Sequence, residues 1–476
     1  MKYDITVGLE IHVELNTNTK LFCGCKNNTM AAANENCCPI CLALPDAPKP
    51  SLNRAAIEKM ITAGLAMDCK INDLTIFERK HYFYPDLPNG YQVSQLERPI
   101  CIGGHLVLRS GKKIRLNRIH LEVDAAKLLH DEVAGVTLVD FNRGGNPLME
   151  MVTEPDFSSA AEAVEFLEEV RSRLIFAGVA NCRMEEGGMR CDVNISLKPK
   201  GAKELGGRVE LKNLNSFKMV ARAIEYEAKR QADFLDNGKR ITQETRKWND
   251  AKGTTSGMRT KEQAVDYRYF PDPVIPPVRI TSAEVERIKR AMPPLAARLR
   301  EMFTVKYSLP AYDAEVLTRD KSVCEFFLES IKLHPEPKKV SNWLMTNILA
   351  KAVNGNIQIS PKQFTDVMKL EGGRKISRQN ALVLFDELWE KPDLNAEAVA
   401  RKLEIFGGIA AAELTKIIDA LFEQNAAALA DYKATPDKVI NFFMGQTMKK
   451  TNGMADSVIA KNYILKRLND SFFFEA

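Results

Sequence analysis

The pattern of apolar and polar positions divides the chain into two parts. Up to about residue 290, short alternating runs such as Ile5–Glu14 and Val209–Leu214 predict strands, and turns rich in Gly, Pro and Asn separate them. Helical periodicity interrupts the strands at Ser158–Phe176, which has a serine to cap its first turn, and at about Phe217–Leu235. The first part is therefore predicted to be a mixed body of strands and helices.

Prolines mark the end of this body. Segment Tyr269–Pro277 contains four prolines and predicts a linker or an irregular edge, because proline denies the backbone a donor. Beyond Pro294 the periodicity is helical throughout. The fold class is predicted to be α+β, with an α+β body at 1–292, a helical domain at 293–405 and a helical tail at 406–476. The first helices expected beyond Pro294 are Ala296–Phe303, Ala314–Thr318, Lys321–Ile331, Val340–Val353 and Pro361–Lys369.

Composition and charge say little about function and bear mainly on where in the cell the protein is expected. The 476 residues are 45% hydrophobic and 27% charged, with a net charge of +5, which is ordinary for a globular protein and demands no nucleic-acid partner. No apolar run approaches the roughly 20 residues of a membrane span. Asp4 and Glu10 occupy the stretch where a secretory signal needs an apolar core, so we expect a cytoplasmic protein with no membrane partner.

Two cysteine pairs predict a metal site. Cys23 and Cys25 form C-x-C, and Cys38 and Cys41 form C-x-x-C twelve residues later. Two such pairs can complete a closed, tetrahedral structural Zn²⁺ site, with the adjacent Cys37 pointing elsewhere. The alternative is a set of buried free thiols, since cysteine is a common small core residue. The isolated cysteines are expected in the core: Cys69, Cys101, Cys182, Cys191 and Cys324.

Acidic and histidine side chains recur at strand spacing. In Val7–Glu14, the side chains of Glu10, His12 and Glu14 share one strand face, while the apolar residues between them face the core. Taken alone, this run is at least as typical of a solvent-facing polar strand as of a cation or phosphate platform. Asn117–Asp124 repeats the alternation with His120, Glu122 and Asp124.

Two further segments favour the functional interpretation. Asn142–Val152 passes from a Gly-rich turn into an apolar strand that contains Glu150, and Met184–Asn194 contains Glu185, Glu186, Arg190 and Asp192. Carboxylates in apolar strands are costly unless they are paired or bind metal. Several of them together with arginines suit an ATP–Mg²⁺ site. The chain has neither a Walker A motif nor G-x-G-x-x-G, so any nucleotide site belongs to neither of those classes.

Taken together, these segments resemble the GatB/GatE family, the B subunits of the aspartyl/glutamyl-tRNA amidotransferases. The likeness covers essentially the first 290 residues and extends into the helical half through LPAYDAEVLT, SNWLM and FFMGQTMKKTNGMAD. The stretches that carry it are VGLEIHVEL, KLFCGC and CCPICLALP, ERKHYFYPDLPNGYQVSQ, NRIHLEVDAAK, DFNRGGNPLMEMVTEPD, MEEGGMRCDVNISL, ELKNLNSF, ETRKW and DYRYFPDPVIPP.

The resemblance implies a division of labour. A partner amidase, the A subunit, releases ammonia from glutamine, and a small C subunit braces the pair. The B subunit binds misacylated tRNA, phosphorylates the side-chain carboxylate of the attached amino acid with ATP and lets ammonia displace phosphate. The implied body has a glutamine-synthetase-like antiparallel sheet, and the implied tail grips tRNA.

The resemblance also assigns residues. The Mg²⁺ and phosphate platform falls on Glu10, His12, Glu122 and Glu150, and Lys80 lies where the family has its ammonia passage. Second candidates are Glu185, Glu186 and Asp192, and Arg190 is expected to steady phosphate charge.

Two departures concern the ammonia passage. The family usually reads P-K-x-Y-Q where this chain has Asn89 in place of the lysine, and H-x-E-E-D-A-G-K where it has Val123 in place of the second glutamate. Because both charges are missing, neither is left buried and unpaired. We interpret this as a rewired passage in an active enzyme.

Two alternatives remain open at this point. A non-catalytic tRNA-binding scaffold would keep the fold without amide transfer, although retention of the Glu10, His12, Glu122 and Glu150 set favours the enzyme. A stand-alone metal-dependent hydrolase would need a nucleophile or metal-bound water that no segment supplies. The sequence does not decide between Asp-tRNA and Glu-tRNA as substrate.

Overall fold

The chain forms two compact units, the first ending at Arg298 and the second beginning at Leu299. The computed structural model describes residues 2–48, 50–131, 133–260, 266–352, 355–391, 394–405, 409, 411–429, 435–451 and 453–473. The first unit mixes strands and helices, and the elements of the second are helices, which confirms the α+β class. The boundary lies six residues after the predicted end of the body.

A ten-stranded sheet forms the centre of the first unit. Its strands follow the order β15-β14-β13-β12-β1-β11-β8-β6-β2, with β7 paired to β8 outside this path. All pairs are antiparallel except β13 with β14. The strands are β1 (Tyr3–Glu14), β2 (Lys70–Ile71), β6 (Cys101–Ile102), β7 (His105–Val107), β8 (Lys113–Val123), β11 (Pro147–Thr153), β12 (Met189–Pro199), β13 (Val209–Lys212), β14 (Glu244–Asn249) and β15 (Thr254–Thr260).

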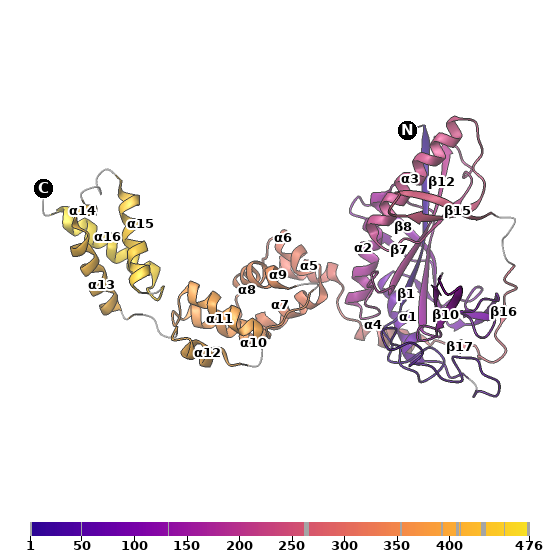
Figure 1. The fold of residues 1–476 in the computed structure, drawn as a ribbon, viewed down its shortest axis with the longest axis horizontal. Coiled ribbons are helices and arrows are strands. Elements are labelled where there is room, and N and C mark those ends of the chain that lie inside the picture. The colour runs from indigo at the N-terminus through magenta and orange to yellow at the C-terminus, as the bar shows by residue number, and fades with distance from the viewer. Residues whose placement is uncertain are drawn as a thin grey trace. The chain divides into compact units, whose positions relative to one another are not determined.

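Helices cover one face of this sheet. The predicted alternation in β1 is confirmed, because Leu9, Ile11 and Val13 are buried in the core that the sheet shares with the helices. Helices α2 (Ala160–Phe176) and α3 (Phe217–Asp236) lie on that side of the sheet (Figure 1), as does α1 (Arg54–Ala66). Of the two serines at its start, Ser159 caps α2 by accepting a hydrogen bond from the Glu162 amide. The polar side chains of β1 are thereby directed to the opposite face.

Three small sheets border the main one. A hairpin joins β9 (Lys127–Asp131) to β10 (Val136–Asp140), and β17 (Val278–Arg279) pairs with β3 (Leu74–Thr75). The third sheet has the order β16-β4-β5. Its edge strand β16 (Phe270–Pro271) belongs to the proline-rich segment, which confirms the predicted irregular edge. The other two strands are β4 (Glu78–His81) and β5 (Tyr91–Ser94).

The described elements that lie wholly in the second unit are helices of 3 to 17 residues. The expected helix at 340–353 is interrupted, because a π-helical turn at Leu344–Ile348 separates two α-helical pieces, and its last residue lies outside the described part of the chain. The last helices form a hydrophobic cluster of their own, around residues such as Ile418, Phe443 and Ile464, where the tail was expected. The division at 405 stays a prediction. The helices after α3 are α4 (Ser282–Ala291), α5 (Ala296–Val305), α6 (Ala311–Leu317), α7 (Lys321–Leu333), α8 (Pro337–Trp343), α9 (Leu349–Lys351), α10 (Pro361–Gly372), α11 (Arg378–Glu390), α12 (Ala396–Lys402), α13 (Ala411–Gln424), α14 (Ala426–Leu429), α15 (Pro436–Lys450) and α16 (Ser457–Phe473).

Across the part of the chain that the structure describes, no helix has both the length and the apolar character needed to cross a membrane.

Candidate active site and metal centre

A polar row crosses four strands on the face opposite the helices. In the strand register, Arg190 on β12 lies opposite His12 on β1, and His12 lies opposite Glu150 on β11. Glu150 in turn lies opposite His120 on β8. Directly opposed residues of an antiparallel pair have Cβ atoms about 4.5–5.5 Å apart, so these four side chains meet. The sheet thus brings together segments that are far apart in the sequence.

Carboxylates surround His12. Its Nε2 atom lies 3.4 Å from Glu150 Oε2, 3.6 Å from Glu10 Oε1 and 3.9 Å from Glu122 Oε1. Two groups of donor atoms lie within 4.8 Å of one another, Glu10 with His12 and Glu150, and His120 with Glu122 and Glu150. Glu150 belongs to both groups. The four residues that the sequence proposed as a platform therefore do converge, and oxygen donors in this number fit Mg²⁺.

The charges of this cluster depend on one another. Burial opposes the protonated form of His12, but Glu150, Glu122 and Glu10 raise its pKa to about 9. Burial likewise opposes ionisation of Glu150, but the neighbouring His120, His12 and Lys80 hold its pKa well below the ordinary value. Burial and repulsion by Glu150 raise the pKa of Glu10. Without a metal, a protonated His12 supplies the positive charge that the carboxylates need.

His120 is a member of the cluster that the sequence did not include among the candidates. Its side chain is buried, with Nε2 3.5 Å from Glu150 Oε2 and 3.7 Å from Glu122 Oε2. Its Nδ1 atom has no hydrogen-bond partner among the described residues. Glu122 is fixed further by a 3.2 Å hydrogen bond from Ser94 Oγ. The alternation in Asn117–Asp124 had placed His120 on the face of Glu122, so the signal was present in the sequence.

Arg190 and Arg118, on the same face of the sheet, each have an N–H group that no described residue accepts. Arg190 donates from Nη2 to Asp124 Oδ2 at 2.8 Å, and Arg143 Nε lies 3.6 Å from the same oxygen. Arg118 on β8 lies two residues before His120, opposite Val152, so its side chain is on the same face as the polar row. The Nε atoms of Arg190 and Arg118 are buried and have no partner among the described residues. Both N–H groups are therefore available to an oxygen of a bound anion, and Arg118 is a second residue that sequence reasoning missed.

The remaining sequence candidates are less central. Asp192 lies opposite Glu10 and is ion-paired with Lys212, so it flanks the cluster. Glu185 and Glu186 lie in the exposed turn before β12, where Glu186 pairs with Arg183 at 2.9 Å, and neither belongs to the two donor groups.

Lys80 projects from β4 near the cluster. Its ammonium lies 5.0 Å from the ring centroid of Tyr267 and 6.0 Å from that of Tyr82, at cation–π distances. Its charge helps to lower the pKa of Glu150, so it acts on the same group of carboxylates.

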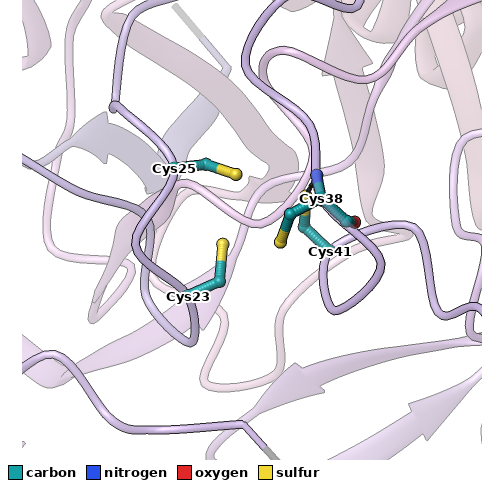
Figure 2. Close-up of side chains that lie close together, drawn as sticks. All are labelled: Cys23, Cys25, Cys38 and Cys41. Atoms are coloured by element: carbon teal, nitrogen blue, oxygen red, sulfur yellow. Dashed lines mark hydrogen bonds between the residues drawn. The ribbon is translucent and has the colours of Figure 1, made fainter. Parts of the chain in front are cut away.

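The four predicted zinc ligands form a second centre. The side chains of Cys23 and Cys25 on one loop point toward those of Cys38 and Cys41 on another (Figure 2), and the four Sγ atoms lie within 4.8 Å of one another. The Cys38 amide donates to Cys41 Sγ at 3.2 Å. A hydrogen bond from the Cys23 thiol is the main cause that lowers the pKa of Cys41 to about 4. Four sulfur donors in this arrangement could bind a zinc ion, whereas Cys37 does not belong to the group and the five isolated cysteines are buried.

A cavity of about 270 Å³ lies between the cysteine loops and the end of β8. Its lining includes Cys23, Cys41 and Asp124, together with Asn89 and Val123, the two positions where the chain departs from the family pattern. Positions 89 and 123 thus face a common space, and a lysine and a glutamate there would be neighbours. The volume is below the roughly 300–1,000 Å³ of sites for drug-sized ligands, which suits a small molecule.

Comparison with known proteins shows the family to which the chain belongs. Residues 5–286 match the GatB/GatE catalytic domain, and residues 325–468 match the GatB domain. The B subunit of the aspartyl/glutamyl-tRNA(Asn/Gln) amidotransferase of Thermodesulfovibrio yellowstonii is 41% identical over 99% of this chain and 100% of its own length. The protein of the same name from Geotalea daltonii is 42% identical over 98% of this chain and 100% of its own. With two family models matching most of its length and relatives above 40% identity from end to end, the chain belongs to the GatB/GatE family of aspartyl/glutamyl-tRNA(Asn/Gln) amidotransferase B subunits.

Proposed function

We propose that this chain is the tRNA-binding, ATP-using subunit of a glutamine-dependent amidotransferase that acts on Asp-tRNA(Asn), Glu-tRNA(Gln) or both. ATP phosphorylates the side-chain carboxylate of the attached amino acid, giving ADP and an acyl phosphate. Ammonia then attacks the acyl carbon, phosphate leaves and a proton is lost, so the carboxylate becomes an amide. A carboxylate is a poor electrophile towards ammonia, and phosphorylation supplies the leaving group.

The observation that carries this proposal is the convergence of Glu10, His12, Glu122 and Glu150 from three strands. Their donor set fits Mg²⁺, and Glu150 is the residue best placed to hold it because both donor groups share this carboxylate. When bound, Mg²⁺ neutralises phosphate charge and orients the phosphates for transfer.

The protein's own residues supply the remaining groups. The unpartnered Nε–H groups of Arg118 and Arg190 are positioned to donate to phosphate oxygens, since they lie on the same face as the carboxylates. Asp124 holds Arg190 in place. At neutral pH the metal-free His12 carries a proton, because its pKa is about 9, and it must release that proton to act as a ligand.

Ammonia is proposed to come from a separate subunit. We find no glutaminase-type nucleophile with its base in the described part of the chain, so a partner amidase, the A subunit, and a small C subunit complete the complex. We propose that the passage for ammonia runs past Lys80 and the cavity that Asn89 and Val123 line, where their uncharged side chains replace a lysine–glutamate pair. We propose that the tail at 406–476 binds tRNA and that the complex works in the cytoplasm.

The cysteine centre is proposed to hold structural zinc. Four protein ligands leave no open coordination position for chemistry, which is typical of a structural site. Metal analysis of protein purified without chelators should find about one zinc per chain. Absence of zinc, or its retention after Cys25→Ser and Cys38→Ser together, would contradict this assignment.

The decisive experiment is transamidation by the reconstituted complex. Each misacylated tRNA is supplied with ATP and glutamine, and formation of Asn-tRNA or Gln-tRNA is measured. Amide formation with either tRNA supports the proposal and names the substrate. Binding of both tRNAs without ATP cleavage or amide formation would instead identify a non-catalytic scaffold.

A further inference from the structure

Lys20 is buried completely, although no carboxylate of the described residues pairs with it. Its side chain is 0% exposed, a state that lysine almost never adopts unless its charge is paired. Its Nζ atom donates to the carbonyl of Phe141 at 2.9 Å and lies 3.7 Å from Cys41 Sγ. Among the described residues no ion pair joins it to an aspartate or a glutamate. A neutral carbonyl satisfies one of its three donors but leaves its charge uncompensated.

The cysteine centre is the anion within reach. A zinc ion held by four thiolates leaves this centre with a net charge of about −2. Cys41 Sγ accepts hydrogen bonds from the Lys20 ammonium and the Cys38 amide, and both donors remain when the cysteine thiols lose their protons to bind zinc. The other lysine on the same loop, Lys26, is exposed and makes no contact with these sulfurs among the described residues. Lys20 is therefore the cation that the fold places against the thiolates.

We propose that Lys20 is the buried counter-charge of a tetrathiolate metal centre, and that it joins this centre to the turn that leads into the catalytic strand β11. The first role follows from the position of Nζ between the Cys41 sulfur and a backbone carbonyl. It halves the net charge of the metal–thiolate group and thereby favours the bound metal. The proposal rests on zinc as the occupant of the cysteine centre.

The second role follows from the hydrogen bonds around Lys20. Its amide donates to the carbonyl of Cys25, which closes the loop that carries the first cysteine pair. Its ammonium holds the carbonyl of Phe141, and the amide of the next residue, Leu21, donates to the carbonyl of Gly145.

The turn held in this way lies against Lys20 and Cys41. Gly145 has φ +88°, and a Cβ atom there would lie 3.6 Å from Lys20 Cδ and 3.6 Å from Cys41 Cβ. The same glycine donates its amide to the carbonyl of Asp124, and two residues later β11 begins and carries Glu150. The metal centre and the catalytic cluster are therefore connected through one turn.

The test compares Lys20→Met with Lys26→Met in the full-length protein. Methionine keeps most of the apolar stem of lysine but removes the charge. Zinc affinity is measured by competition with a chromogenic chelator. Loss of a group next to metal ligands typically costs 10–100-fold in affinity, so we expect a decrease of about that size for Lys20→Met. Lys26→Met should bind zinc as the wild type does, and Lys20→Arg, which keeps the charge, should lose less than Lys20→Met.

A double-mutant cycle separates charge from packing. A Cys23→Ser, Cys41→Ser background removes two of the four thiolates, including the Cys41 sulfur that Lys20 contacts. In that background Lys20→Met should leave the midpoint of thermal unfolding unchanged or raise it, whereas in the zinc-loaded wild type it should lower the midpoint. An equal effect of Lys20→Met in both backgrounds, or equal zinc affinities of Lys20→Met and Lys26→Met, would overturn the proposal. Wild-type protein that binds no zinc would overturn the zinc assignment as well, so the two failures are distinguishable.

Discussion

Replacing Glu150 by Gln tests the proposed active site most directly. The change keeps the shape of the side chain and removes one negative charge from a residue that both donor groups share. Glu150 also contacts two histidines, with Oε2 3.4 Å from His12 Nε2 and 3.5 Å from His120 Nε2. A single substitution thereby weakens every ligand set that the cluster can offer to Mg²⁺.

The size of the effect follows from the electrostatics. A pKa of about 9 for His12, against 6.5 for the free side chain, corresponds to about 3 kcal/mol of net attraction for its proton. Glu150 is first among the groups that raise this pKa. In Glu150→Gln the pKa of His12 should fall, and the metal-free protein should lose about 1–3 kcal/mol of stability, because Glu10 and Glu122 still compensate part of the charge. Loss of one preorganised charge from a catalytic site typically lowers kcat by about 10²–10³-fold.

The assay is tRNA-dependent ATP cleavage by the reconstituted complex, with tRNA binding measured in parallel. Glu150→Gln should lose ATP cleavage and retain tRNA binding, and added ammonium salts should not restore amide formation because the defect precedes the attack of ammonia. Glu168→Gln is the matched control, since Glu168 is exposed on α2 and away from the cluster. Normal ATP cleavage by the Glu150→Gln complex would show that the phosphorylation site lies on other residues.

Three further predictions concern protonation, the tail and the passage. The folded-state pKa of His12 lies above its unfolded value, so its stabilisation of the Mg²⁺-free protein is complete below about pH 6.5 and is lost as the pH rises through 9. Thermal unfolding measured without Mg²⁺ and without a chelator, so that the cysteine centre keeps its zinc, should show this loss, and His12→Gln should abolish it. Ending the chain at residue 405 should weaken tRNA binding and lower the salt dependence of that binding, while the first unit keeps its circular dichroism. An unchanged affinity for tRNA would refute a tRNA-binding tail. Val123→Glu places a carboxylate at a position only 8% exposed and should lower the free energy of unfolding by several kcal/mol. Adding Asn89→Lys should recover part of this stability, because both positions line one cavity. Free ammonia should restore any loss of glutamine-dependent activity.

Short-range patterns determined much of what the structure contains. Period-two alternation assigned Glu10 and His12 to one face of β1 and Ile11 to the other, because successive side chains of a strand point to opposite sides. A serine before an apolar helical pattern located the start of α2. The spacing of the cysteines identified all four members of the sulfur cluster, since C-x-C and C-x-x-C turns each direct two thiols to one point. The family motifs supplied four residues of the proposed catalytic cluster, Glu10, His12, Glu122 and Glu150.

The tertiary structure decided which strands are neighbours and in what register. That Glu150 lies between His12 and His120 follows from the order β1-β11-β8, which no local pattern encodes. The same pairing explains the residues that the sequence did not single out. Alternation had placed His120 on the face of Glu122, but its contact with Glu150 and the position of Arg118 follow only from the pairing of β8 with β11. The role of Lys20 follows only from the packing of its loop against the turn at 141–145. Glu185 and Glu186 show the converse, because their motif resembles the others but their turn leaves them exposed.

The physical reason is the range of the interactions involved. Alternation, capping and cysteine spacing are set by the geometry of a few consecutive residues, so the sequence alone determines them. Burial and charge pairing depend on residues more than a hundred positions apart, and the cost of an unpaired buried charge is known only when its surroundings are known. The sequence therefore determined the candidate ligands of both centres, and the tertiary structure alone decided that a buried lysine serves one centre and a buried histidine the other.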